Sequence, residues 1–401
     1  MAWLSGWDKR IKITVDASVL TDANDLTQFP LTLICKAGLA GIGDVDVSCI
    51  FDEVGANGLK IAVTTDDGET QLYVEQELWD NGNEDFVLHV SKAGWVIDSE
   101  TDTDLYIYYD NDHADNTTYV GVIGSTPGQA VWRTDYYVAV QHNVDATTST
   151  ITESTAGGFN GTKKGANEPI EVVGQIGDAQ DFDGSDDYIK TAEDASFNLE
   201  DFTLAALIYV TANDNTSWTR IIGKDNVEDG GARTLYVLRA SSLGNTDKPE
   251  MAAFDGTNNP RATSSDAIGT GWHYIEGVRD AGTTLKLYVD GVEKASVEDT
   301  TSGVLGGTTN LHYGALWNQY TTPAEFFNGI IDEARASKVI LSDAWRKAER
   351  YSVTDALLTW GSEETGTSIK TVMGVPIANI KTVNGVPIAN VKSFLGVSNV
   401  S

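Results

Sequence analysis

Short runs of alternating apolar and polar residues, separated by turns rich in Gly, Asp and Asn, recur along most of this chain. Residues 11–15 (IKITV) and 59–63 (LKIAV) alternate with a period of two, and residues 104–109 (DLYIYY) form a strongly β-favouring run. A period of two buries one face of a strand. About six such runs precede residue 130 without a long helical period, so the pattern predicts an all-β chain that begins with a β-sandwich.

The length of the chain and its changes in pattern predict three segments. At about 100–200 residues per domain, 401 residues correspond to two or three domains. We expect an N-terminal β-sandwich domain at residues 1–130, a second sandwich at 131–365 and a short tail at 366–401. The tail is set apart by an eleven-residue repeat that begins at residue 369.

The second segment contains a series of strand and turn signals in a specific order. Asp290-Gly291 follows an apolar run and predicts a tight type I′ hairpin. Residues 342–350 (SDAWRKAER) predict a short helix with Ser342 as its N-cap. The other signals are residues 137–142 (YVAVQH), 177–189 (GDAQDFDGSDDYI), 201–208 (DFTLAALI), 272–275 (WHYI) and 327–335 (FNGIIDEAR).

These motifs, in this order, resemble the laminin-G-like domains of the concanavalin A-like lectin/glucanase group. The resemblance implies a jelly-roll sandwich over residues 131–365. Family members usually carry Trp near position 207, where this chain has Leu207. Residues 7–14 (WDKRIKIT), 77–80 (ELWD) and 105–109 (LYIYY) resemble an uncharacterised β-domain that precedes laminin-G-like domains in bacterial and phage surface proteins. That second resemblance brings no known active site.

The tail consists of two copies of one repeat and a third, decayed copy. Residues 369–379 read IKTVMGVPIAN, residues 380–390 read IKTVNGVPIAN, and VKSFLGVSNV follows from Val391. Each copy predicts a small hairpin, which cannot bury a core alone and so needs a partner surface. Similar repeats occur at the termini of tailed-phage virion proteins. This resemblance implies attachment to other virion proteins through residues 366–401 and a homo-oligomer, with a trimer suspected.

The charge of the chain disfavours two classes of partner, and its other bulk features bear on where it is made. The net charge of −32 disfavours nucleic acid and anionic lipid, and no apolar run reaches the roughly 18 residues of a membrane helix. We expect Cys35 and Cys49 to be free thiols. The start of the sequence lacks a signal-peptide pattern. We therefore expect a protein made in a host cytoplasm and carried on a virion surface.

The sequence does not predict an enzyme. Glucanases of this fold type use three acids that alternate on one strand, whereas Glu75 and Glu77 alternate without a third acid and predict a solvated strand face. None of the five His residues lies in a nucleophile or zinc motif, and His142 and His273 are expected to be packed or hydrogen-bonded. We expect no catalytic residue.

Ligand-binding candidates come from carboxylates and from aromatic residues in polar loops. The laminin-G-like resemblance implies that a cofactor, if one is present, is a structural Ca²⁺, which takes hard oxygen ligands at strand ends; the candidate ligands are Asp183, Asp186, Asp187 and Asp332. The competing interpretation is that Asp183-Gly184 only makes a turn and that Asp332 caps a hydrogen-bond network. Aromatic faces stack on sugar rings while amides bind hydroxyls. The candidate glycan-binding residues are Trp317, Asn318, Tyr320 and Trp218. The competing interpretation is that these side chains pack on their own domain or on a neighbouring subunit.

Three functions remain open from the sequence. The first is a structural protein of a tailed-phage virion, a head decoration, head fibre or tail-associated fibre, that displays a lectin-like module for cell-surface or environmental polysaccharide. The second is a bacterial surface or secreted glycan-binding adhesin. The third is a polysaccharide-degrading enzyme, which the missing acid triad disfavours.

Overall fold

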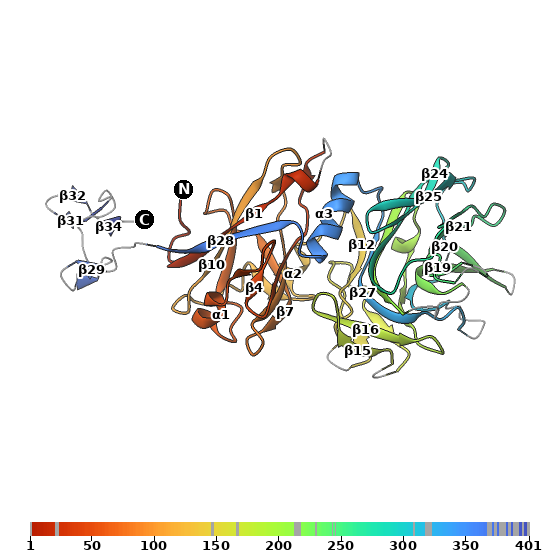
Figure 1. Cartoon of the computed structure of the whole chain (residues 1–401), viewed down its shortest axis with the longest axis horizontal. Helices are drawn as coiled ribbons and strands as arrows, with labels where there is room; N and C mark the ends of the chain where they lie inside the picture. Colours follow the sequence, from red (N-terminus) through yellow and green to blue (C-terminus); the bar gives the residue numbers. More distant parts are fainter. Residues whose placement is uncertain are drawn as a thin grey trace.

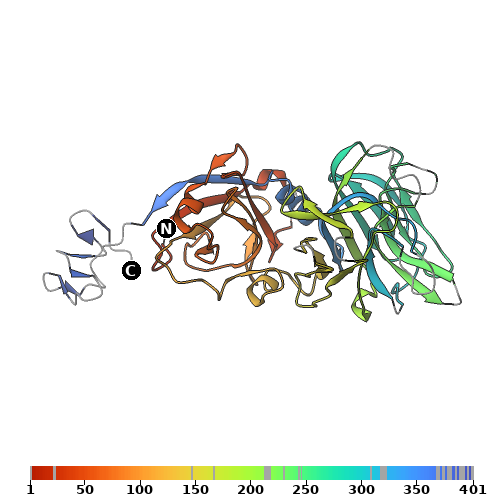
Figure 2. The same ribbon diagram turned by 90° about the horizontal axis from the view of Figure 1, so that it is seen from below.

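The protein is an all-β molecule of two β-sandwiches, as the computed structural model shows (Figure 1). The structure describes residues 2–20, 24–145, 148–165, 168–211, 218–228, 231–242, 244, 246–307, 309–316 and 323–366, together with six two-residue strands in the tail. The two sandwiches follow one another along the long axis of the molecule (Figures 1 and 2). The predicted all-β fold class is confirmed.

The N-terminal sandwich consists of two sheets that enclose one apolar core. One sheet has the strand order β28 (Leu358–Thr365), β1 (Lys9–Val15), β10 (Thr103–Tyr109) and β6 (Ile61–Thr65). The other has the order β11 (Val120–Val122), β7 (Tyr73–Asp80), β8 (Asp85–Ser91), β3 (Leu31–Lys36), β4 (Leu39–Ala40) and β5 (Val45–Asp46). Ile11, Ile13 and Val15 of β1 all point into the core, as their alternation predicts. Smaller elements complete the sandwich: β2 (Leu26–Thr27), β9 (Val96–Ile97), α1 (Cys49–Val54), α2 (Thr126–Gln129) and a 3-10 turn at Ala17–Val19.

Strand β28 returns the C-terminal part of the chain to this first sandwich. It pairs antiparallel with β1, from Val15 with Leu358 to Lys9 with Thr365. Leu358 and Trp360 are buried in the N-terminal core. The predicted division assigned residues 358–365 to the central domain, and this assignment is wrong at the level of sheet pairing. Pairing of residues about 350 positions apart leaves no local signal in the sequence.

The central sandwich also consists of two sheets. The first has the order β15 (Ile170–Val173), β16 (Asp178–Asp183), β27 (Asn328–Ser337), β18 (Phe202–Val210), β23 (Gly271–Asp280), β24 (Thr284–Val289) and β25 (Val292–Glu298), and β12 (Tyr137–Gln141) pairs with β27. The second has the order β13 (Thr150–Ile151), β14 (Gly161–Lys163), β17 (Ile189–Glu193), β26 (Asn310–Tyr313), β19 (Arg220–Glu228), β20 (Gly231–Arg239), β21 (Glu250–Ala253) and β22 (Arg261–Thr263). A 3-10 turn at Ala195–Phe197 precedes β18.

Two local predictions in the central segment are confirmed. Asp290 and Gly291, which join β24 to β25, both have positive φ angles, 52° and 76°, as a type I′ turn requires. Helix α3 (Asp343–Val353) begins after Ser342, whose side chain accepts a hydrogen bond from the Trp345 backbone N–H. The helix is thus fixed at its start by its own sequence.

Helix α3 and a small apolar cluster join the two sandwiches. Trp345 and Ala348 of α3 lie in the N-terminal core, while Val353 joins a cluster that both sandwiches share. That cluster contains Ile34 and Val87 from the first sandwich and Ala205, Leu207 and Tyr274 from the second. Leu207 is 1% exposed. Its large apolar side chain therefore contributes to the domain interface.

Charged side chains are also buried at this interface. The side chains of Glu75 and Glu77 on β7 are 0% exposed, so the predicted solvated strand face is wrong. The face of β7 that points away from the N-terminal core is covered by the second sandwich, where His142 lies 3.3 Å from Glu75 through Nε2. His142 is fully buried and hydrogen-bonded, as predicted; His273 is hydrogen-bonded to Asp290 (2.8 Å) and is only partly buried.

The tail contains the predicted hairpin pairs. In the first, β29 (Thr371–Val372) pairs with β30 (Val375–Pro376). The second pairs β31 (Thr382–Val383) with β32 (Val386–Pro387), and the third pairs β33 (Ser393–Phe394) with β34 (Val397–Ser398). Cys35 and Cys49 are free thiols. Among the described helices, none has the length and apolar character needed to span a bilayer.

Candidate functional site

Trp218 lies two residues before β19 and next to a group of buried ion pairs. Its ring centroid is 5.5 Å from the guanidinium carbon of Arg239 and 5.3 Å from that of Arg261. Trp218 has a φ of 52°, a left-handed conformation that is uncommon for a large side chain. Its indole Nε1 is buried and has no hydrogen-bond partner among the described residues. Trp218 is therefore a half-buried aromatic residue whose ring lies beside two guanidinium groups.

The ion pairs beneath Trp218 fix its surroundings. Glu250 accepts hydrogen bonds from Arg239 (2.6 Å) and lies 3.2 Å from Arg261. Burial, and next the charge of Arg220, lowers the pKa of Arg239 to about 10, so this guanidinium keeps its charge at neutral pH. The side chain of Arg261 is 31% exposed. This set of charges presents an aromatic ring beside a cation that solvent can reach.

A second group of ion pairs, centred on Arg220, connects the surroundings of Trp218 to the segment that contains Glu325. Arg220 binds Glu325 through Nε (2.6 Å) and Asp225 through Nη1 (2.9 Å). His312 Nε2 lies 2.8 Å from Asp225. Burial raises the pKa of Asp225, but the charges of Arg220 and His312 lower it more, so its pKa is below the usual value. Asp225 is thus a permanent anion rather than an acid that exchanges protons near neutral pH.

The predicted residues Trp317, Asn318 and Tyr320 lie outside the described residues. The base of their loop is described: Leu316 and Ala324 form a backbone bridge, with hydrogen bonds of 2.7 and 3.2 Å. The Arg220 N–H donates to the Glu325 carbonyl (3.1 Å), which places this loop base next to the start of β19, two residues after Trp218. The sequence treated Trp218 and the loop as separate candidates, and the structure brings Trp218 and the loop base together.

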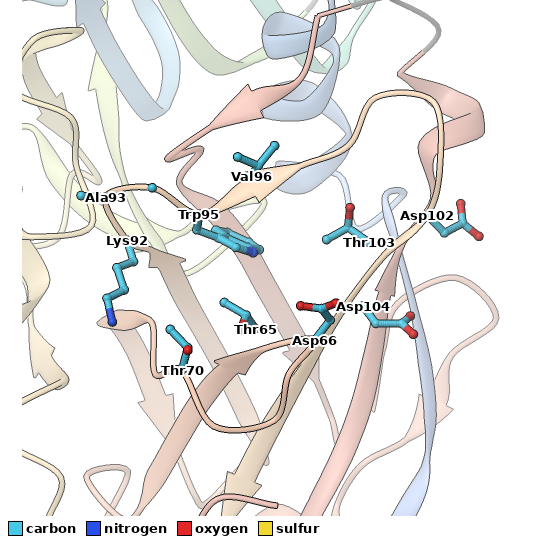
Figure 3. Close-up of a pocket in the computed structure, with 11 residues that line it drawn as sticks. Thr65, Asp66, Thr70, Lys92, Ala93, Trp95, Val96, Asp102, Thr103 and Asp104 are labelled. Atoms are coloured by element: carbon cyan, nitrogen blue, oxygen red, sulfur yellow. The ribbon is translucent and has the colours of Figure 1, made fainter. Parts of the chain in front are cut away.

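A cavity of about 540 Å³ in the N-terminal sandwich is a second candidate that the sequence did not indicate. Trp95 lies among Val96, Thr65 and Thr103, and acidic side chains stand near it (Figure 3). Trp95 is only 7% exposed. The lining comes from three separate chain segments, residues 65–70, 92–96 and 102–104, so no contiguous motif could have predicted it.

Most polar groups of this cavity already have partners. Asp104 accepts hydrogen bonds from Thr14 (2.6 Å) and Lys12 (3.3 Å), and Lys92 donates to the Gln71 carbonyl (3.0 Å). Its volume falls in the range of small-ligand pockets, roughly 300–1,000 Å³. The cavity can hold a sugar-sized ligand, with an apolar floor and an acidic rim.

The acidic turn after β16 brings three of the four predicted calcium ligands together. Carboxylate oxygens of Asp183, Asp186 and Asp187 lie within 4.8 Å of one another. Their hydrogen bonds are those of a turn: Asp183 accepts from the Ser185 N–H (2.8 Å), and Asp187 accepts from the Asp183 N–H (3.0 Å). Lys164 pairs with Asp186. Turn hydrogen bonds and Lys164 therefore already engage these three carboxylates, and the calcium site stays a prediction.

Asp332, the fourth predicted calcium ligand, does not join the turn, so this part of the prediction is wrong. It is fully buried and lies four positions along β27 from Asn328, the residue that pairs with Asp183. Its Oδ2 accepts hydrogen bonds from the Gln175 and Ile176 N–H groups (3.1 and 3.3 Å). Burial, and next the negative charge of Glu333, raises the pKa of Asp332 well above its usual value.

Comparisons with solved structures find similar chains of low sequence identity. One is domain 4 of AbnA, a GH43 extracellular arabinanase from Geobacillus stearothermophilus, in complex with arabinotriose: 19% identity, 55% of this chain, 98% of that chain, TM-score 0.41. Another is the binding domain of Paraclostridial Mosquitocidal Protein 1, with 11% sequence identity and a TM-score of 0.42. The match covers 54% of this chain and 52% of that chain. A third is the ligand binding domain of Botulinum neurotoxin serotype D in complex with N-acetylneuraminic acid, with 12% sequence identity and a TM-score of 0.40. The match covers 54% of this chain and 50% of that chain.

The chain spans about half the length of the two toxin chains. A search of curated protein sequences finds no match. Residues 183–345 match the family model of the concanavalin A-like lectin/glucanases superfamily. The matched residues run from the end of β16 to α3 and cover most of both sheets of the second sandwich. The central sandwich of this chain is therefore a concanavalin A-like lectin/glucanase domain.

Proposed function

We propose that this chain is a non-catalytic structural protein on the surface of a tailed-phage virion and displays a lectin-like domain that binds carbohydrate. The match of residues 183–345 to a lectin/glucanase family carries the binding part of the proposal. Trp218 supports it, because a partly exposed indole ring can stack on a sugar ring. The charged side chains around Trp218 are paired with one another and keep their charges at neutral pH, which suits ligand binding better than acid–base catalysis.

The place where the tail leaves the molecule supports display in an assembly. Thr365, the last residue of β28, pairs with Lys9 at the start of β1. This end of β28 points away from the central sandwich (Figures 1 and 2). A tail fixed to a particle would therefore hold the lectin-like domain outward. Weak sugar binding by many copies on one particle would gain strength through avidity.

Carbohydrate binding is tested by applying the full chain to a glycan array and measuring the strongest ligand by calorimetry. Trp218→Ala should weaken that binding about tenfold, the effect of losing one aromatic contact of roughly 1.4 kcal/mol. Ile170→Ala is the matched control, because Ile170 is an exposed apolar residue (58%) on a strand of the other sheet. A wild-type chain that binds no glycan contradicts the proposal. Loss of binding in Asp66→Lys but not in Trp218→Ala would place the ligand in the N-terminal cavity instead.

Attachment is tested with a chain that ends at Gly366. This chain keeps β28 and should bind glycan as the full chain does, yet fail to join phage particles and lose the oligomeric state of the full chain, which light scattering measures. Incorporation of the shortened chain into particles would show that the tail is not the anchor. A bacterial surface adhesin is the alternative; fractionation of producing cells would then find the full chain on the cell envelope.

A further inference from the structure

Four side chains that commonly bind metals meet between the two sandwiches, at a point distinct from Trp218 and from the N-terminal cavity. Glu77 on β7 and His89 on β8 come from the first sandwich. His142, directly after β12, and Glu333 on β27 come from the second. One ligand atom of each lies within 4.8 Å of the others. Each sandwich therefore supplies one imidazole and one carboxylate to the same point.

The donor atoms are already close to the spacing of a coordination shell. Glu77 Oε2 lies 2.8 Å from His89 Nε2 and 3.4 Å from His142 Nδ1. His142 Nδ1 is also hydrogen-bonded to Glu333 Oε1. Tetrahedral zinc with bonds of about 2.0–2.1 Å separates its donor atoms by roughly 3.4 Å. Small shifts of side chains would place all four donors around one ion.

Neighbouring groups orient both imidazole rings and the Glu333 carboxylate. The second nitrogen of His89, Nδ1, is hydrogen-bonded to Thr32 Oγ1 (3.1 Å), and the second nitrogen of His142, Nε2, faces Glu75 Oε2 (3.3 Å). Trp132 Nε1 donates to that same Glu75 oxygen (2.5 Å). Metal-binding histidines are typically oriented by such a bond from the nitrogen that does not bind the metal. Arg335 donates to Glu333 Oε2 (2.5 Å) and leaves Oε1 facing the histidine.

The buried carboxylates of this interface outnumber their arginine partners, and some of their oxygens lack a hydrogen bond. The side chains of Glu77, His89, His142 and Glu333 are all 0% exposed. Glu75 Oε1 and Glu77 Oε1 are buried and have no hydrogen-bond partner in the described part of the chain. Of the four acids in this space, which are Glu75, Glu77, Asp332 and Glu333, only Glu333 pairs with an arginine among the described residues. Burying several carboxylates with so few cationic partners is unfavourable, and a divalent cation would offset that cost.

We propose that Glu77, His89, His142 and Glu333 bind one divalent transition-metal ion of the Zn²⁺ class, and that this ion fastens the two sandwiches together. Two imidazoles with two carboxylates suit Zn²⁺ and related ions, whereas Ca²⁺ takes oxygen ligands throughout. The four side chains expose no surface to solvent, so the site is structural and not catalytic. The same burial means that the ion enters as the two sandwiches dock.

The experiment uses the full chain, unfolded in guanidinium chloride with a chelator, desalted, and refolded with or without Zn²⁺. After gel filtration, the zinc-refolded chain should contain one Zn²⁺ per chain by elemental analysis. Its Tm should exceed that of the metal-free chain by roughly 5 °C or more, because an ion that binds only the folded state stabilises it. Refolding with Co²⁺ should give the intense visible absorption of four-coordinate cobalt.

Variants locate the ion. Glu77→Gln and His142→Gln should each lose the zinc and the cobalt absorption. Two controls should retain one zinc: His312→Gln, which changes another buried imidazole bonded to a carboxylate (2.8 Å), and Asp186→Asn in the exposed acidic turn. A wild-type chain that refolds without zinc and with an unchanged Tm would show a hydrogen-bonded cluster only and overturn the proposal. Zinc retained by both ligand variants would also overturn it. If the variants do not fold, wild-type zinc content and the cobalt spectrum decide.

Discussion

A chain that stops after Ala356 should not fold its N-terminal sandwich, although it loses none of residues 1–130. It lacks β28, which pairs with β1 and buries Leu358 and Trp360 in the core of that sandwich, and it lacks Leu357, which is 0% exposed. Removing two buried Leu and one Trp costs roughly 6 kcal/mol or more. Because whole domains are stable by only about 5–15 kcal/mol, this loss is enough to unfold the first sandwich. Near-ultraviolet circular dichroism and limited proteolysis measure it.

The chain that ends at Gly366 is the matched control, since it differs from the first variant by ten residues that contain β28. It should melt as the full chain does, because the tail strands it lacks pair with one another. Equal protease resistance of the two shortened chains would show that β28 contributes little to the fold. Protease resistance of the shorter chain restored by an added peptide of residues 357–366 would support strand pairing directly.

Local features of the fold were predictable because their causes are local. The alternation in residues 11–15 defines one buried face, and Asp-Gly is one of the residue pairs that adopt two successive positive φ angles most easily, as Asp290 and Gly291 do. Ser342 begins α3 because its side chain satisfies a free N–H of the first turn. The pairing of β28 with β1 was not predictable in the same way, since its partners are distant in the sequence.

The interface was misjudged for a related physical reason. Alternation at Glu75 and Glu77 shows that two faces differ, and it does not show whether the polar face meets water or a second domain. His142 was expected to be buried, and a buried histidine needs polar partners. Its partners Glu75, Glu77 and Glu333 come from strands of both sandwiches, so only the docked structure brings this cluster together.

The candidate ligand sites were also predictable only where their residues are close together in the sequence. The acidic turn at Asp183, Asp186 and Asp187 is compact in the sequence and in space, whereas Asp332 was grouped with it only through a resemblance and lies elsewhere. Trp218 was selected as an aromatic residue in a polar segment. The arginines and acids that hold it, Arg239, Arg261 and Glu250, could not be linked to it without the sheet order of β19, β20, β21 and β22.

Replacing Arg279 by Met should strongly destabilise the central sandwich. Arg279, at the end of β23, is 0% exposed and donates to Asp299 (2.8 Å), to Thr301 (2.9 Å) and to the carbonyls of Glu200 and Gly303. Asp299 is 2% exposed, so it would remain as a buried charge without its partner. Breaking one side of a buried pair typically costs about 3–5 kcal/mol. A drop of roughly 10 °C in the Tm of this domain is expected by calorimetry.

Two further variants separate the charge effect from the loss of packing. Lys286→Met removes an exposed pair with Glu293 (3.1 Å) in the same sheet and should cost less than about 1 kcal/mol. The double variant Arg279→Met with Asp299→Asn should be more stable than Arg279→Met alone, because the unpaired charge is gone while the lost contacts are the same. If the double variant is no more stable than Arg279→Met alone, the unpaired charge of Asp299 is not the cause of the loss. A Tm for Arg279→Met within 1 °C of the wild type would mean that solvent or the neighbouring N–H groups of Gly282 and Thr301 already compensate Asp299.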